Sequence, residues 1–153
     1  MKITSTWLTL FIAAMPLVLG SMCLKNPEGS ILGSWKEIKW QYEKYGAKYK
    51  THGPDGNIRI KEKFLMSRAR IIHESEIWTF YRDNSLVLFK NNGTHEKVQW
   101  HLKGRGHILK MNHQDGGVEC YQIKRIKHDE MVLHFESETH ARGIIKIIFQ
   151  KIS

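Results

Sequence analysis

The sequence predicts an all-β protein in which about eight antiparallel strands form an up-and-down barrel, with a long loop or lid after the first strand. From residue 76 onward, short runs of aromatic and β-branched residues alternate with turn signals rich in Gly, Asn and Asp, as in successive antiparallel strands. Some runs, such as residues 144–149, are apolar enough to aggregate at an open sheet edge, and barrel closure removes that edge. An open sandwich of the same strands is the alternative.

The N-terminal segment is typical of a signal peptide. In residues 1–22 a single charge, Lys2, precedes an apolar run that is too short to span a bilayer comfortably. We expect residues 23–30 to be a tether and residues 31–153 to be one barrel domain, since 41% hydrophobic and 25% charged residues are typical of a globular domain. The protein is therefore expected to be exported, as a periplasmic or outer-membrane lipoprotein or otherwise as a secreted protein.

Cys23 has three alternative fates, which the position of signal cleavage decides. Cleavage immediately before Cys23 would allow lipid attachment and a membrane anchor, cleavage after Gly20 would keep its thiol, and a later cut would remove it. In an oxidising compartment a retained thiol can form a disulfide with Cys120, the only other cysteine. Without that bond, we expect Cys120 to be a small buried residue on a strand.

The predicted elements follow the tether in order. The first strand is expected over residues 34–42, and the Gly- and Lys-rich residues 44–57 are expected to form a loop. Residues 58–73 fit neither the strand nor the helix period cleanly, so they are expected to form a short helix or an irregular lid. The later strands are expected over residues 76–82, 85–90, 94–103, 107–112, 118–127, 131–138 and 142–151.

Alternation along each strand selects the side chains expected inside the barrel. They form either a packed core or the lining of an apolar cavity for one small ligand. Strict alternation puts Trp35 and Trp40 on opposite faces, so both face inward only if a bulge breaks the pattern. We expect Trp35 at the barrel floor, and Ile38, Trp40 and Tyr42 on the inner face. The candidate ligand-binding residues are Trp40, Trp78, Phe80, Trp100, Leu133 and Phe135.

Several segments of the predicted barrel share a pattern with a known family, namely ILGSWK, WTFYRDNSLVLF, HILKM, YQIKRIKHDEMVLHF and GIIKIIFQK. Through these segments the chain resembles the bacterial lipocalin-like domain over most of residues 30–151. The resemblance implies that Gly33 leaves room for the backbone where the first strand joins the barrel floor, and that Trp35 closes the floor. It also implies that a basic residue near the last strand covers the Trp35 ring, and Arg142 stands in that position.

Two functions from different classes agree with this interpretation. The resemblance implies an exported barrel that binds a small apolar or amphipathic ligand. The alternative is a ligand-free interaction module of the cell envelope. Without residues 1–22 the formal net charge is +8, against +9 for the whole chain. The basic surface of an exported protein would meet anionic lipid, glycan or a protein partner rather than nucleic acid. The sequence does not specify an oligomeric state.

We expect no enzymatic activity, no cofactor and no metal ion. The nine histidines lack the paired short spacings of zinc sites and are expected on exposed strand faces. The segment His73-Glu74, Asp115 and Glu119 offer titratable groups without a recognisable catalytic arrangement. An enzyme would instead show a polar cluster inside the barrel mouth.

Overall fold

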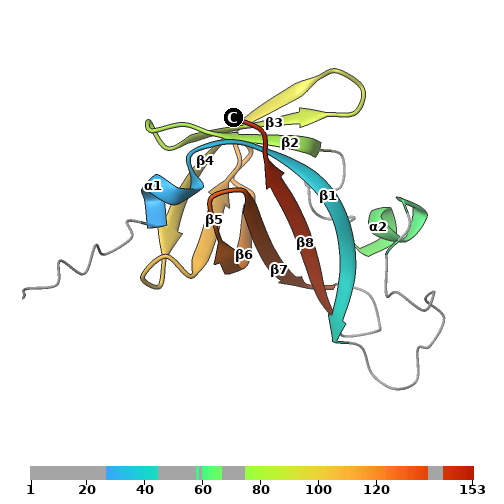
Figure 1. Ribbon diagram of the computed structural model, residues 1–153. Helices are drawn as coiled ribbons and strands as arrows, with labels where there is room; N and C mark the ends of the chain where they lie inside the picture. Colours follow the sequence, from blue (N-terminus) through green and yellow to red (C-terminus); the bar gives the residue numbers. More distant parts are fainter. Residues whose placement is uncertain (1–26, 45–57, 59, 67–74, 138–142) are drawn as a thin grey trace, which may run out of the picture.

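The computed structural model describes residues 27–44, 58, 60–66, 75–137 and 143–153 (Figure 1). The predicted signal peptide, Cys23 and the loop over residues 45–57 lie outside the described residues. Neither described helix is long and apolar enough to cross a membrane. The elements are α1 (Pro27–Ile31), β1 (Gly33–Lys44), α2 (Ile60–Met66), β2 (Ser75–Phe80), β3 (Ser85–Lys90), β4 (His95–Lys103), β5 (Ile108–Asn112), β6 (Val118–Ile126), β7 (Glu130–Glu136) and β8 (Ile144–Lys151).

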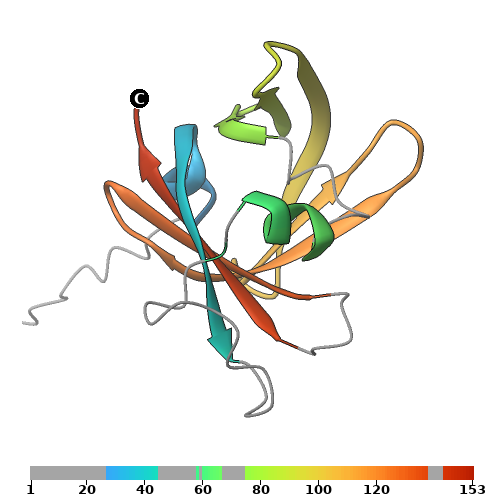
Figure 2. The same ribbon diagram turned by 90° about the vertical axis from the view of Figure 1, so that its right-hand side faces the viewer.

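The strands form a closed barrel in chain order, which confirms the predicted fold. Each strand pairs antiparallel with the next one, and β8 returns to pair with β1. The barrel is visible end-on in Figure 2, where α2 lies in front of the ring of strands. The short helix α2 also confirms that residues 58–73 contain a helix, because it occupies Ile60–Met66.

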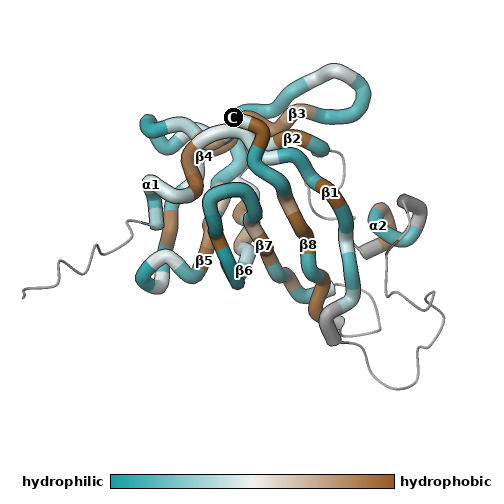
Figure 3. The backbone as a smooth tube through the Cα atoms, viewed as in Figure 1, coloured by the Kyte–Doolittle hydropathy of each residue, from teal (hydrophilic) through white to brown (hydrophobic). Residues whose placement is uncertain are grey.

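Alternation between a buried and an exposed face gives the barrel its core. Along β8, which is largely hydrophobic (Figure 3), burial alternates from residue to residue, so that Ile145, Ile147 and Phe149 are fully buried while their neighbours are not. Such alternation removes one apolar row per strand from water. The six predicted lining residues obey it, since none of them is more than 4% exposed. They are Trp40, Trp78, Phe80, Trp100, Leu133 and Phe135.

The first strand contains the bulge that the two tryptophans require. Trp35 and Trp40 are both buried, and the register of β1 against β8 shifts between Glu37 and Lys39. The extra residue is Ile38, which is 51% exposed. The prediction that Ile38 faces inward is therefore wrong, because the bulge sends two consecutive side chains outward before alternation resumes at Trp40.

One end of the barrel is sealed by backbone contacts around Gly33. Its φ of 105° is in the left-handed region, and a Cβ atom there would lie 2.4 Å from the carbonyl oxygen of Ser153. That carbonyl accepts a hydrogen bond of 3.0 Å from the amide of Ser34. Gly33 thus lets the C-terminal segment run against the start of β1.

Trp35 lies fully buried at this sealed end. Its indole N–H donates a hydrogen bond of 2.7 Å to the carbonyl of Ile31, and this bond holds α1 against the Trp35 side chain. The ammonium of Lys151, on β8, lies 5.1 Å from the ring centroid. This cation–π contact is made by a basic residue of the last strand, whereas Arg142, the predicted cover, lies outside the described residues.

Cys120 differs from expectation. It lies on β6, as predicted, but it is exposed rather than buried. Its neighbours Glu119 and Tyr121 face inward, so the pleat turns Cys120 to the outside of the barrel.

We expect Gly33→Ala to lower the free energy of unfolding by about 2 kcal/mol, because a Cβ atom is disfavoured at positive φ and would collide with Ser153. Urea unfolding measured by circular dichroism checks this value. Gly29→Ala in α1 is the control, since no atom lies within 4 Å of the added Cβ. It should change stability by less than about 1 kcal/mol. Equal stability of both variants would contradict the assigned role of Gly33.

Candidate functional site

A continuous column of aromatic rings runs through the barrel. The Trp100 and Phe80 centroids are 5.3 Å apart, and Phe80 leads to Trp78 at 6.3 Å. From there Tyr121 follows at 5.9 Å. The column continues to Phe135 at 5.9 Å and ends at Trp40, a further 5.5 Å away. Five of the six predicted lining residues belong to this column, which we call the aromatic column. These tilted and edge-to-face contacts stabilise the interior beyond simple burial of area.

At the end of the barrel opposite α1, the helix α2 lies over the strands (Figures 1 and 2). Its Lys63 donates hydrogen bonds of 2.7 and 2.8 Å to both carboxylate oxygens of Glu37 on β1. The same ammonium lies 4.7 Å from the centroid of the Trp40 ring. We call this end the mouth, and these contacts between Lys63, Glu37 and Trp40 the latch, because they hold α2 to the barrel.

Burial raises the pKa of the Glu37 carboxyl above its ordinary value of 4.5. The ion pair and hydrogen bonds with Lys63 oppose this rise, and the nearby Glu76 adds to it. The direction of the net shift shows that the cost of removing the carboxylate from water exceeds what its partners return. Glu37 is therefore a largely buried acid whose carboxylate is stabilised by the Lys63 cation beside it.

A second polar group at the mouth, here called the mouth cluster, consists of Glu96, His113, Glu119 and Tyr121. The two ring nitrogens of His113 face opposite carboxylates, with Nδ1 3.3 Å from Glu96 and Nε2 3.0 Å from Glu119. The hydroxyl of Tyr121 donates a short hydrogen bond to Glu119. Because Tyr121 also belongs to the aromatic column, the cluster joins the polar rim of the mouth to the apolar interior.

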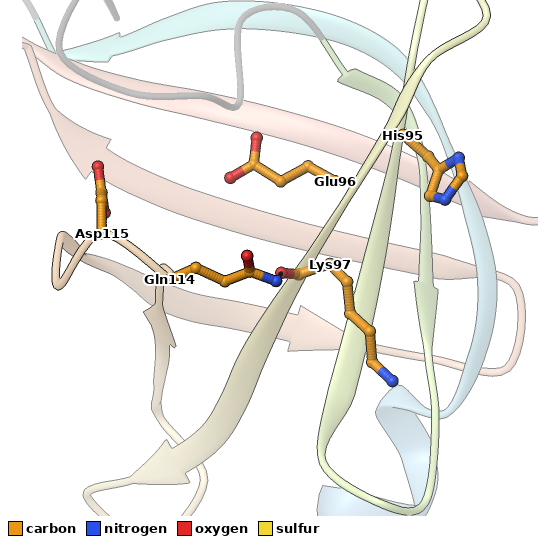
Figure 4. A pocket seen from close by; sticks show the side chains of 5 residues that line it. All are labelled: His95, Glu96, Lys97, Gln114 and Asp115. Atoms are coloured by element: carbon orange, nitrogen blue, oxygen red, sulfur yellow. Dashed lines mark hydrogen bonds between the residues drawn. The ribbon is translucent and has the colours of Figure 1, made fainter.

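Glu96 also borders a pocket of about 450 Å³ at the rim of the mouth. In Figure 4, Glu96 projects from one side of β4 while His95 and Lys97 project from the other, and Gln114 and Asp115 come from the turn after β5. Solvent in this pocket therefore reaches the outer edge of the mouth cluster.

The buried polar atoms without a hydrogen-bond partner in the described part of the chain include the indole N–H of Trp78 and the hydroxyl of Ser75. Both residues are fully buried. A buried polar group without a partner costs roughly 1–3 kcal/mol, so such atoms indicate where a polar group of an occupant would be favourable.

Among the six histidines within the described residues, the prediction of exposed faces is wrong for two. His113 is 8% exposed and His134 is 5% exposed. His113 directly follows β5 and faces into the barrel. His134 lies on the outer face of β7, between β6 and β8. Among the described residues, no group of three or more His, Cys, Asp and Glu side chains is arranged to hold a metal ion.

Glu37 and the mouth cluster were not predicted as site residues from the sequence. The signal was available for β4 and β6, because Glu96 shares the inward phase of Val98 and Trp100, as Glu119 shares that of Tyr121. Glu37 and Lys63 had no such signal, since their contact spans residues far apart in sequence. The ligand-binding role of the six lining residues remains a prediction, although all six lie inside the barrel.

The topology and the sealed end together define the class of fold. Eight antiparallel strands closed in chain order, a Gly-x-Trp motif at the floor and a basic residue over the Trp ring are the features that the resemblance implied. The fold is therefore a lipocalin-like barrel.

Comparison with models of protein families finds no match, and neither does a search of curated proteins. Among solved structures, a lipocalin-like protein from Bacteroides uniformis is similar with a TM-score of 0.48 and 15% identity, covering 81% of this chain and all of its own. A bovine odorant-binding protein in complex with a selenium-containing odorant is similar with a TM-score of 0.45 and 10% identity, and the match covers 82% of this chain and 73% of that protein. Aphrodisin, a sex pheromone from female hamster, is similar with a TM-score of 0.41 and 13% identity, and the match covers 79% of this chain and 74% of that protein. Likenesses of this size carry no information about a ligand or an activity.

The raised pKa of Glu37 predicts a pH dependence of stability. Between 4.5 and the higher pKa of the folded protein, the folded state binds more protons than the unfolded state. The contribution of Glu37 to the free energy of unfolding therefore falls as pH rises through this window. We expect the difference in stability between the wild type and Glu37→Gln to decline over the same window, as measured by urea unfolding from about pH 4 to pH 7.

Glu136→Gln is the matched control for this measurement, because it removes an exposed carboxylate from β7. Its stability relative to the wild type should show a weaker trend. A difference between wild type and Glu37→Gln that rises with pH would contradict the raised pKa of Glu37.

Proposed function

We propose that the protein is an exported barrel that binds a small apolar or amphipathic ligand through its mouth. The observation that carries this proposal is the contrast between the two ends of the barrel. The sealed end is closed by backbone hydrogen bonds and by the Trp35 plug. The mouth is covered by the seven-residue helix α2, which is held mainly by side-chain contacts, with a backbone hydrogen bond of 3.0 Å just before it from the amide of Ile58 to the carbonyl of Trp40. Side-chain contacts with water on one side break more readily than a backbone ladder, so ligand exchange is expected at the mouth.

The aromatic column gives the proposed ligand its surroundings. Trp40, Phe135 and Tyr121 lie at the mouth end of the column, next to the latch and the mouth cluster. A ligand with an apolar body and a polar end would place the body against these rings and the end at the polar rim. Rotation of the rings and displacement of α2 would supply the room.

Binding is favoured over catalysis even though a polar cluster lies in the mouth. Both ring nitrogens of His113 already face carboxylates, and the oxygens of Glu119 face His113 and Tyr121. A general acid or base needs an atom that reaches the substrate, and His113 presents neither nitrogen to the mouth. We therefore assign the mouth cluster to positioning and electrostatics.

Export and anchoring belong to the same proposal. Residues 1–22 would direct the chain out of the cytoplasm, and Cys23 would carry a lipid, form a disulfide with Cys120 or be removed with the signal. The intact mass of the mature protein from its native source distinguishes these fates. The alternative function, a ligand-free module that meets anionic surfaces, predicts binding to anionic vesicles that weakens as salt is raised.

Titration of the full chain with octan-1-ol, followed by the indole N–H signals in NMR spectra, tests the proposed site. We expect the signals of Trp40 and Trp78 to shift, because both rings belong to the aromatic column. The Trp35 signal should stay in place, since its N–H is hydrogen-bonded to Ile31 at the sealed end. Substitution of each Trp by Phe assigns the signals. Shifts confined to Trp35, or absent from all buried indoles, would overturn the proposed function.

A further inference from the structure

The charges that face the mouth have the opposite sign to the protein as a whole. The chain carries a formal net charge of +9. Yet the inward-facing row at the mouth includes three carboxylates, Glu37, Glu96 and Glu119. Their lysine partners are Lys63, which belongs to α2, and Lys90, which lies 3.6 Å from Glu96. The His113 ring lies between Glu96 and Glu119. With α2 displaced, the mouth would hold more negative than positive charge.

The Lys63 ammonium lies between Glu37 and Trp40, in a position that we call the seat. The seat has the composition of an ammonium-binding site. A carboxylate supplies two charge-assisted hydrogen bonds, and the face of a tryptophan ring lies 4.7 Å from the nitrogen. A carboxylate together with an indole face is a combination that attracts organic cations strongly when it is shielded from water. The side chains of Lys63 and Glu37 are only 13% and 12% exposed, so the seat is shielded.

Displacement of α2 would leave Glu37 without this cation. An ionised carboxylate that is buried and unpaired is costly, and the ring face of Trp40 would lose its charge at the same time. A ligand that opens the lid therefore gains most if it brings its own ammonium group to the seat. An uncharged or anionic ligand would have to overcome the cost instead.

We propose that the ligand is an amphipathic amine, whose protonated nitrogen replaces the Lys63 ammonium between Glu37 and Trp40 while its apolar tail lies along the aromatic column. This inference rests on the proposed ligand-binding function and names the chemical class of the ligand. Lys63 is then an internal stand-in for the ligand and competes with it for the seat.

The unpartnered polar atoms of the interior support an amphipathic occupant over a hydrocarbon. The Ser75 hydroxyl and the Trp78 N–H are fully buried and lack partners within the described residues, and neither belongs to the latch. A second polar group on the ligand, such as a hydroxyl, would accept a hydrogen bond from the Trp78 indole N–H or donate one to the Ser75 hydroxyl, separately from the ammonium between Glu37 and Trp40. A purely apolar occupant would leave both atoms unsatisfied.

The test compares octylamine, octan-1-ol and octanoate, which share one tail and differ in the charge of the head. Affinities for the full chain are measured by isothermal titration calorimetry at neutral pH. We expect octylamine to bind about tenfold more tightly than octan-1-ol, and octanoate to bind most weakly. Equal affinities for octylamine and octan-1-ol would overturn the amine proposal while leaving the proposed function intact. No binding of any of the three would mean that the proposed function itself fails.

Substitutions at Glu37 and Trp40 test whether the seat causes the preference for octylamine over octan-1-ol. Glu37→Gln should reduce the ratio of octylamine to octan-1-ol affinity from about ten to about one, because the amide keeps the shape and loses the charge. Glu136→Gln removes an exposed carboxylate from β7 and should keep the ratio. If Glu37→Gln fails to fold by circular dichroism, Trp40→Phe replaces it, since the smaller ring weakens the cation–π contact and should lower the ratio severalfold. A ratio unchanged in the folded seat variant would overturn the proposal.

Removal of the Lys63 ammonium should raise the affinity for octylamine, whereas the substitutions at Glu37 and Trp40 should lower it. Lys63→Met keeps an unbranched side chain on α2 but vacates the seat, so octylamine should bind about tenfold more tightly than to the wild type. Lys103→Met, at the exposed end of β4 far from the mouth, lowers the net charge equally and serves as the control. Tighter octylamine binding by both variants to the same extent would indicate a general charge effect and would overturn the competitive role of Lys63.

Discussion

The pairing of β1 with β8 is the constraint on which the rest of the structure depends. It closes the ring of strands and, like the pairing of β1 with β2, it is not specified by a local turn. Its register is shifted by the bulge at Ile38, and this shift allows Trp35, Glu37 and Trp40 to face inward together. Without the bulge, strict alternation would send Trp40 outward and separate it from Glu37.

The two ends of the barrel differ in what holds them closed. At the sealed end, Gly33 admits the C-terminal backbone to hydrogen-bonding distance of Ser34, and Trp35 fixes α1. These contacts form when the barrel closes. At the mouth, the Lys63 ammonium holds α2 through a carboxylate and a ring face, and the amide of Ile58, just before α2, donates a hydrogen bond to the carbonyl of Trp40. The fold thus combines a stable scaffold with a region whose local opening does not require the barrel to unfold.

The sequence predicted the fold well because barrels are encoded locally. Period-two alternation and turn residues set the strands, and the same alternation placed Trp78, Phe80 and the other lining residues inside. Ile38 was misplaced because a bulge follows from pairing between β1 and β8, which a single strand does not reveal. The latch was missed for a related reason. Glu37 and Lys63 meet only through the fold, whereas the inward phase of Glu96 and Glu119 was already present in the alternation of their strands.

The placement of α1 has a consequence for orientation. The described chain begins at Pro27, beside the sealed end, while α2 lies across the opposite end (Figures 1 and 2). If the chain is held to a surface by its N-terminal side, as the lipid-anchor proposal requires, the barrel would stand with its floor toward that surface. Its mouth would then face away from the surface, and a ligand would enter from the surrounding aqueous space rather than from the bilayer that holds the anchor.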